Sequence, residues 1–206
     1  MRRFVLKALC LCLLLSMCLP LASCARNGLN AYKEDKETGK DGYYVAMMVA
    51  DYGEIILYLD ATVAPATVEH FVALVRDDFY SGTTFHRVIS NFMIQGGAPK
   101  GNKRPGNVVG EFLANGYYNT LSHKRGVISM ARADDYNSAS SQFFICNADS
   151  PHLDYKYAAF GWVVSGMEVV DAITSSTAGF GNSNGMISDT SRQAVIAEMK
   201  VIVYEE

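Results

Sequence analysis

Short apolar runs separated by turn-forming residues recur from residue 44 to the C-terminus, and this pattern constrains the fold more than any other feature. The runs are rich in β-branched and aromatic residues, which favour strands. They cover residues 44–50, 54–59, 85–89, 92–95, 126–131, 142–146, 158–164 and 194–204. Because Asp51-Tyr52-Gly53 separates the first two runs, we predict that they form a hairpin. A chain built from eight such runs is predicted to be mainly β.

Two segments depart from the strand pattern. In residues 65–77 the apolar residues return at helical spacing, and Pro65 suits the first turn of a helix. The apolar face consists of Val68, Phe71, Val72 and Val75. A second, shorter helix is predicted over residues 167–173. Many strands with two helices indicate a capped barrel, although the pattern alone does not distinguish a closed barrel from a sandwich.

The final run, residues 194–204, is predicted to be a strand that places every second residue on one face. Those residues are Val195, Ala197, Met199, Val201 and Val203. Just before this run, residues 179–185 consist mostly of Gly, Asn and Ser, which predicts a series of turns.

The first 23 residues have the composition of a signal peptide. Arg2, Arg3 and Lys7 supply the positive start, and residues 8–19 are almost wholly apolar. An apolar run of this length falls short of the roughly 20 residues that span a bilayer as a helix. Export with removal of residues 1–23 is therefore expected, in preference to a permanent membrane span.

The apolar run is followed by Leu21-Ala22-Ser23-Cys24, which resembles the bacterial lipobox. The resemblance implies a diacylglycerol on Cys24 and a cleavage that leaves Cys24 as the new N-terminus. The alternative is a plain secretory signal with an incidental cysteine. Residues 24–42 are polar and carry charges of both signs, so we interpret them as a lipid-anchored flexible tether. The expected location is the bacterial cell envelope, on the outer side of a membrane.

Cysteine and histidine chemistry is not expected to contribute to function. Three of the five cysteines lie in residues 1–23 and Cys24 is the expected anchor, which leaves only Cys146 and no internal disulfide. Cys146 stands in an apolar run and is expected to be a buried thiol. The four histidines lack the spacing of a metal site, so neither a metal nor another cofactor is expected.

The charge balance argues against one class of partner. Three of the 18 basic residues lie in the signal segment and all 21 acidic residues follow it, so the rest of the chain is mildly acidic. Nucleic-acid binding needs clustered Lys and Arg, and no such cluster follows Lys7. A nucleic acid is therefore not expected as a partner. Residues 43–206 are long enough for one domain, which is expected to be monomeric.

Three separated blocks carry a resemblance to a known family. They read FHRVI (85–89) followed by NFMIQGG (91–97), then GVISMARA (126–133), then SQFFI (141–145). In order, composition and spacing these blocks resemble the cyclophilins, and the resemblance extends over residues 44–206. It implies a closed, eight-stranded antiparallel barrel capped by two α-helices, with a shallow substrate groove on the outer face.

The resemblance also implies peptidyl-prolyl cis-trans isomerase activity on proline-containing peptides and unfolded exported proteins. Rotation about a peptide bond crosses a barrier of about 18–20 kcal/mol. Because the proline nitrogen regains a lone pair in the twisted transition state, a fixed donor aimed at that nitrogen stabilises this state. The resemblance places Arg87 at the catalytic donor and assigns Gln95 to orient Arg87 and the substrate carbonyl.

The same resemblance assigns the substrate contacts. The apolar seat for the proline ring is formed by Phe92, Met93, Phe144 and Leu153. Backbone groups of Ala131 and Arg132 are expected along the groove floor, where they pair with an extended substrate. Gln142 is placed at the edge of the groove and Tyr157 at one side, with His152 beside Leu153.

Three positions depart from the usual family pattern. His152 stands where many members carry tryptophan, Tyr157 stands where they carry histidine, and Arg132 stands where asparagine is frequent. Since that tryptophan donates a hydrogen bond to cyclosporin in the family, His152 implies weak cyclosporin binding. Tyr157 keeps an aromatic wall and adds a hydroxyl, which implies a similar pocket shape with a shifted substrate preference.

Two other functions fit part of the sequence. A peptide-binding chaperone would use the same groove without turnover, but the presence of both Arg87 and Gln95 favours the enzyme. A lipid-tethered adhesion or scaffold domain would need an extra exposed patch or a repeat, and the sequence pattern indicates neither.

Overall fold

The computed structural model describes residues 41–204. The predicted signal peptide, the predicted anchor Cys24 and residues 24–40 of the predicted tether lie outside the described residues, as do residues 205 and 206. Within residues 41–204, no helix combines the length and the apolar character needed to cross a membrane.

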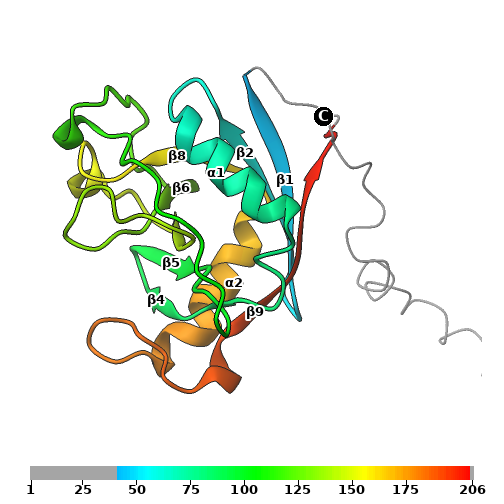
Figure 1. Ribbon diagram of the computed structural model, residues 1–206. Helices are drawn as coiled ribbons and strands as arrows, with labels where there is room; N and C mark the ends of the chain where they lie inside the picture. Colours follow the sequence, from blue (N-terminus) through cyan, green and yellow to red (C-terminus); the bar gives the residue numbers. More distant parts are fainter. Residues whose placement is uncertain (1–40, 205–206) are drawn as a thin grey trace, which may run out of the picture.

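One antiparallel sheet of nine strands runs through the described chain (Figure 1). Its strands are β1 (Gly42–Val49), β2 (Gly53–Asp60), β3 (Thr84–Phe85), β4 (Arg87–Ile89), β5 (Met93–Gly96), β6 (Val127–Met130), β7 (Phe143–Cys146), β8 (Ala159–Ser165) and β9 (Ala194–Ile202). Their order in the sheet is β3-β9-β1-β2-β8-β6-β7-β5-β4. The predicted hairpin is confirmed, because β1 and β2 pair along their whole length.

The sheet closes on itself at His86. The predicted strand 85–89 is split there, so that β3 pairs with β9 while β4 pairs with β5. Since β3 and β4 are consecutive in the chain, they bring the two ends of the sheet together, and the His86 N–H donates to the Gln95 carbonyl at 3.1 Å. The predicted eight-stranded antiparallel barrel is confirmed, with one of its strands divided in two.

Two α-helices pack on the barrel (Figure 1): α1 (Pro65–Arg76) and α2 (Met167–Thr177). The prediction for α1 is confirmed, whereas α2 continues four residues beyond the predicted end. The buried face of α2 extends from Val169 to Thr177, whose hydroxyl donates to the Ile173 carbonyl at 2.7 Å. Four short 3-10 helices complete the described chain: η3 (Leu113–Asn115), η4 (Pro151–Leu153), η5 (Ala178–Phe180) and η6 (Thr190–Arg192).

Aromatic rings fill the core between α1 and the sheet. The ring of Phe71, on α1, has its centroid 4.9 Å from that of Tyr80, 5.5 Å from Phe143 and 5.2 Å from Phe160. All four side chains are almost completely buried. Offset and edge-on pairs of this kind add about 0.5–1.5 kcal/mol each to the burial of apolar area. Because side chains occupy the interior, a substrate site must lie on the outside of the barrel.

The predicted face of the last strand is correct only for Met199 and Val201, since Val203 lies beyond the end of β9 and is exposed, and the first half of the strand is shifted. Met48 pairs with Glu198 but the next residue, Val49, pairs with Ile196, so Ala197 is an extra residue in β9. Such a bulge shifts the alternation by one residue. Ala194 and Ile196 are therefore buried, while Val195 and Ala197, which were predicted to share a face with Met199, are exposed.

Candidate active site

A second apolar cluster lies outside the barrel, on the outer face of β5 and β7. Side chains alternate along each strand, so Ile94 and Ile145 point into the core while Met93 and Phe144 point outward. Leu153, from η4, packs on these two residues from outside. This outer cluster provides an apolar floor at the surface.

Arg87 lies beside that floor with its guanidinium held from two sides. Arg87 is paired with Gln95 across β4 and β5, and its Nη1 donates to Gln95 Oε1 at 3.0 Å. Its Nε donates to the Asn184 carbonyl at 2.8 Å. Gln95 is itself fixed, because its Nε2 donates to Gln142 Oε1 at 2.9 Å. The donors of Arg87 are therefore oriented before any substrate binds.

The loop that supplies the Asn184 carbonyl is built by hydrogen bonds. The side-chain oxygen of Asn182 accepts the N–H groups of Asn184 at 2.9 Å and Met186 at 3.1 Å, and Val88 N–H donates to the Gly185 carbonyl at 2.9 Å. Gly185 has φ +77°, and a Cβ there would stand 2.8 Å from the Val88 carbonyl oxygen. The sequence predicted turns in this segment, but nothing in it pointed to the contact with Arg87.

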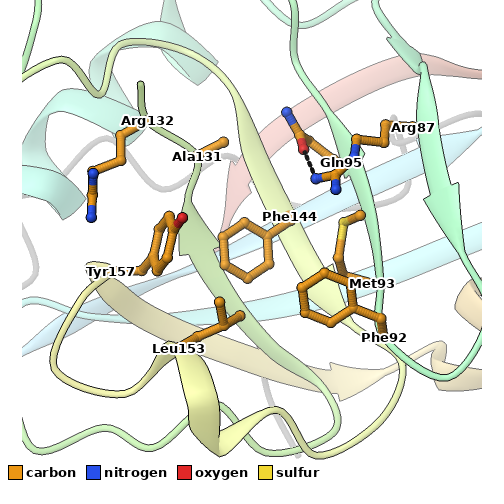
Figure 2. A pocket seen from close by; sticks show the side chains of 9 residues that line it. All are labelled: Arg87, Phe92, Met93, Gln95, Ala131, Arg132, Phe144, Leu153 and Tyr157. Carbon is orange, nitrogen blue, oxygen red and sulfur yellow. Dashed lines mark hydrogen bonds between the residues drawn. The ribbon is translucent and has the colours of Figure 1, made fainter. Parts of the chain in front are cut away.

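Nine of the predicted site residues line one hollow of about 230 Å³ between Arg87 and Tyr157 (Figure 2). They are Arg87, Phe92, Met93, Gln95, Ala131, Arg132, Phe144, Leu153 and Tyr157. Figure 2 shows Phe144 in the middle, with Arg87 and Gln95 at one end and Tyr157 and Arg132 at the other. Residues separated by up to 70 positions in the sequence thus meet at one surface, as the resemblance implied.

Two predicted contact residues do not line the hollow. Gln142 is hydrogen-bonded to Gln95 and fixes the orientation of its side chain. His152 is exposed, and its ring lies 5.2 Å from that of Phe92, centroid to centroid. A direct contact of Gln142 or His152 with a substrate therefore remains a prediction.

The guanidinium of the half-buried Arg132 is surrounded by three aromatic rings at one end of the hollow. Its guanidinium carbon lies 5.3 Å from the ring centroid of Phe112, 4.8 Å from that of Tyr136 and 4.7 Å from that of Tyr157. Its nitrogens donate to the carbonyls of Lys156, at 3.1 Å, and Ala133, at 2.8 Å. The charge that departs from the family pattern thus ties Tyr157 to neighbouring segments.

One of the backbone groups expected to pair with a substrate is already engaged. The Ala131 N–H donates to the Gln142 carbonyl at 2.9 Å, which extends the β6–β7 ladder. This N–H therefore has no free hydrogen for an extended peptide, so pairing by the Ala131 N–H is not supported, while pairing by the backbone of Arg132 stays a prediction.

His123 packs against Phe144 in the apolar floor, a role that the sequence did not indicate. Its ring is stacked on Phe144, with centroids 5.9 Å apart and planes at 16°. Its Nδ1 lies 2.9 Å from Asp154 Oδ1 and its Nε2 lies 3.0 Å from Ser129 Oγ. Burial lowers the pKa of His123, so the ring is neutral at pH 7 and donates from Nδ1 to the Asp154 carboxylate.

The groups around the hollow suit binding and polarisation without bond breaking. The nine residues that line the hollow include no carboxylate and no thiol, and their only hydroxyl is the phenol of Tyr157. Burial raises the pKa of the nearby Cys146 thiol to about 12, which leaves it protonated. Among residues 41–204, no three His, Cys, Asp or Glu side chains gather as metal ligands would. The hollow offers a fixed cation beside an apolar seat.

Relatives of this chain share its sequence over the barrel. The family described as cyclophilin type peptidyl-prolyl cis-trans isomerase/CLD matches residues 44–201. Peptidyl-prolyl cis-trans isomerase A of Dickeya dadantii is 44% identical over 133 residues, which cover 62% of this chain and 70% of that protein. A peptidyl-prolyl cis-trans isomerase of Helicobacter pylori is 40% identical over 144 residues, which cover 68% and 85%.

Solved structures have the same fold. A crystal structure of a cyclophilin type peptidyl-prolyl cis-trans isomerase from Cryptosporidium parvum superposes with a TM-score of 0.66 and 26% identity, covering 80% of this chain and 99% of that one. A crystal structure of the same protein in the presence of the dipeptide Ala-Pro gives a TM-score of 0.65. Since the family match spans residues 44–201 and the relatives share both sequence and barrel, the chain belongs to the cyclophilin-type peptidyl-prolyl cis-trans isomerase family.

Proposed function

We propose that the Arg87 hollow is the place where this isomerase turns Xaa-Pro peptide bonds, with Arg87 as the catalytic residue. The observation that carries the proposal is the guanidinium fixed between Gln95 and the Asn184 carbonyl, at the edge of an apolar floor. The reaction needs no covalent intermediate, because its barrier of about 18–20 kcal/mol arises from lost amide resonance.

The fixed guanidinium favours the twisted state over both planar states. When the amide rotates out of plane, the proline nitrogen becomes pyramidal and gains a lone pair that accepts a hydrogen bond. Arginine stays charged at any ordinary pH and presents donors from a rigid plane. A donor that is already oriented requires no reorganisation as the bond turns, which makes the interaction stronger in the transition state.

The apolar floor holds the proline ring of the substrate while the acyl group that precedes the proline rotates. Met93 is 1% exposed, Phe144 5% and Leu153 8%, so only their outer atoms meet a ligand. Such a shallow seat accepts a compact apolar ring. The relative crystallised in the presence of Ala-Pro supports the assignment of proline-containing peptides as ligands.

The setting of this activity is the outside of a cell membrane. A signal peptide over residues 1–23, a lipid on Cys24 and a polar tether over residues 24–42 together support export to the bacterial cell envelope with attachment to the membrane. The substrates in that compartment are unfolded exported proteins that contain proline, whose folding is limited by isomerisation over roughly 10–100 s.

A protease-coupled isomerisation assay on the chain without its signal segment tests the role of Arg87. Arg87→Ala is expected to lower kcat/KM by about 10²- to 10³-fold, the usual loss on removing a pre-oriented donor. Arg192→Ala is the matched control, because Arg192 lies over the ring of Phe180 and is not part of the hollow.

Two results would count against the proposal. If the Arg87→Ala variant kept full activity with an unchanged circular dichroism spectrum, another group would have to polarise the amide. If the wild-type chain bound proline peptides without accelerating their exchange, it would act as a peptide-binding chaperone instead.

A further inference from the structure

A third apolar cluster lies on the outer face of β1, β2 and β9, where an antiparallel barrel usually meets water. Ala46, Ile56 and Ile202 are 0%, 2% and 1% exposed, although their strand neighbours Val45 and Leu57 already fill the barrel interior. Tyr44, Met48 and Tyr204 pack over these three side chains. Among the described residues, no helix lies over this face (Figure 1), so tyrosine and methionine form its cover.

Four aromatic side chains form a continuous row across this face. From ring to ring, the centroid distances are 5.1 Å for Tyr204–Tyr44, 5.1 Å for Tyr44–Tyr58 and 5.0 Å for Tyr58–Trp162. We call these four residues the aromatic row. At its β8 end the row is open to solvent, because Trp162 and its outward neighbour Val164 are each 37% exposed.

The aromatic row lies opposite the Arg87 hollow. With β3 and β4 counted as one strand, the order around the barrel is β3/β4, β9, β1, β2, β8, β6, β7, β5. Four steps around this ring lead from β1 to β7 and from β2 to β5. Since the hollow lies on the outer face of β5 and β7, the strand order places the two apolar outer surfaces on opposite sides of the barrel.

The polypeptide that precedes the barrel arrives at the aromatic row. The hydroxyl of Tyr58 donates to the Asp41 carbonyl at 3.3 Å. A Cβ on Gly42 would stand 2.8 Å from Cζ of Tyr58, so the chain crosses directly over that ring. Only residues 25–40 separate this point from Cys24, and even fully extended they span at most about 55 Å.

We propose that the aromatic row is a membrane contact that lies at the lipid–water interface once Cys24 is anchored. Tyrosine and tryptophan favour this depth because each joins an apolar ring to a polar tip. The short tether turns the contact into an intramolecular one, with an effective concentration in the millimolar range. Even if the affinity of the aromatic row for lipid is too weak for the free domain to bind vesicles, the tethered domain would spend much of its time in contact with the bilayer. This inference rests on the proposed lipid anchor and not on the isomerase activity.

The charges beside the row indicate which lipids matter. Burial raises the pKa of Tyr58, and the nearby negative charges of Asp60 and Asp41 raise it further. The positive charge of Lys200 is paired with Glu198 at 2.7 Å. No excess of positive charge therefore faces an anionic lipid surface at this end of the row. The contact should depend on aromatic insertion, with little change between 50 and 500 mM salt, about a threefold change in Debye length.

Docking by this face would give the isomerase a fixed orientation. With the row on the bilayer, the Arg87 hollow points away from the lipid and towards the proteins that emerge outside the membrane. A freely tumbling domain on a tether would present the hollow to the bilayer for part of the time.

Trp162, the only tryptophan of the chain, reports on the contact directly. The chain from Cys24 onward contains the whole barrel and can be coupled through its Cys24 thiol to a maleimide phospholipid in phosphatidylcholine vesicles, because Cys146 is fully buried. Bromine-labelled acyl chains are expected to quench roughly a third or more of the Trp162 emission. The reason is that a contact with a dissociation constant of about 1 mM is about half occupied at an effective concentration in the millimolar range. The uncoupled chain mixed with the same vesicles should show little quenching.

Two variants separate insertion from mere proximity. The double variant Tyr44→Thr with Tyr204→Thr keeps strand-favouring residues and is expected to lose most of the quenching while its isomerase activity is unchanged. Tyr118→Thr is the matched control, because Tyr118 is 78% exposed and lies outside the row. Equal quenching in the double variant would overturn the assignment to the row.

Other outcomes also decide the matter. Wild-type Trp162 unaffected by brominated lipid, although the chain is coupled, would refute the membrane contact. The proposal would also be refuted if Trp162 became shielded from aqueous iodide as the density of protein on the vesicles rose, with no effect of the bromine label. That result would indicate contact between copies of the chain. The mass of the N-terminal peptide from the native protein reports separately whether Cys24 carries a lipid, and the isomerase assay tests the hollow.

Discussion

Arg87 owes its position to pairing within the sheet. Arg87 and Gln95 are direct partners in an antiparallel ladder, so both side chains emerge on the outer face at hydrogen-bonding distance. The same ladder continues to Phe144, the partner of Gln95 in β7, which lies in the floor of the hollow. The donor and the floor are therefore fixed relative to each other by three adjacent strands.

Arg132 is a positioning residue for Tyr157. Lysine at this position would keep the charge but lose the planar stacking and the fork of donors. Arg132→Lys is expected to raise KM several-fold and to change kcat less, a loss of about 1–2 kcal/mol that corresponds to about five- to thirtyfold in kcat/KM. Arg192→Lys, which alters a similar arginine–aromatic pair over Phe180, should leave both constants unchanged.

A double-mutant cycle shows whether Arg132 acts through Tyr157. If it does, Arg132→Lys should have little further effect in a Tyr157→Ala background. Strict additivity of the two losses would show instead that Arg132 contacts the substrate on its own.

At the scale of elements, α1 depends on a residue far away in the sequence. Its N-terminus has no side-chain cap of its own. The buried carboxylate of Glu111 takes that place, accepting from Ala66 N–H at 3.1 Å, Thr67 N–H at 2.8 Å and the Thr67 hydroxyl at 2.6 Å. A negative charge at this end also complements the helix dipole. Glu111 thereby joins the loop before η3 to the helix that covers the barrel.

Removing this remote cap should destabilise the whole domain. Glu111→Ala is expected to lower the free energy of unfolding by about 2–3 kcal/mol, because it leaves buried donors without a charged acceptor. Urea denaturation measures this loss. Glu69→Ala, on the exposed side of the same helix, is the control and should change stability by less than about 0.5 kcal/mol. Equal effects of the two substitutions would show that Glu111 contributes no more than a surface residue.

At the scale of the whole molecule, buried ionisable groups make stability depend on pH. Burial lowers the pKa of His123 below its ordinary 6.5, against the opposing influence of Asp154. Burial likewise lowers the pKa of His86. For Asp154, burial raises the pKa, but hydrogen bonds from His123 and Ser122 outweigh it and lower the value below 3.8. The Asp154 shift stabilises the folded state at neutral pH, whereas the two histidine shifts destabilise it once the pH falls below their ordinary pKa.

The unfolded chain takes up protons on these histidines as the pH falls through 6.5, while the folded chain takes them up only at lower pH. The free energy of unfolding is therefore expected to fall by about 1–2 kcal/mol between pH 7.5 and 5. Asp154 adds a further loss below about pH 4. His123→Asn should remove part of this dependence between pH 7.5 and 5 and leave the part due to His86, as urea titrations at each pH would show. A wild-type profile that is flat over this range would contradict the shifts.

The sequence predicted most elements because their signals are local. The helical spacing of Val68, Phe71 and Val75 marked α1, and the Asp51-Tyr52-Gly53 turn marked the first hairpin. The last strand was only half predicted, because the bulge at Ala197 arises from its pairing with β1. The site residues were found by resemblance of sequence blocks, since nothing local to Arg87, Phe144 or Tyr157 indicates that they meet.

By itself, the sequence determined the alternation of strands, the two helices, the expected signal segment and the family resemblance, because each depends on neighbouring residues or on a contiguous motif. The tertiary structure alone decided the closure of the barrel at His86, the cap that Glu111 gives to α1, the aromatic cage of Arg132 and the position of the aromatic row opposite the hollow. These features join residues tens of positions apart, and only packing and strand pairing bring such residues into contact.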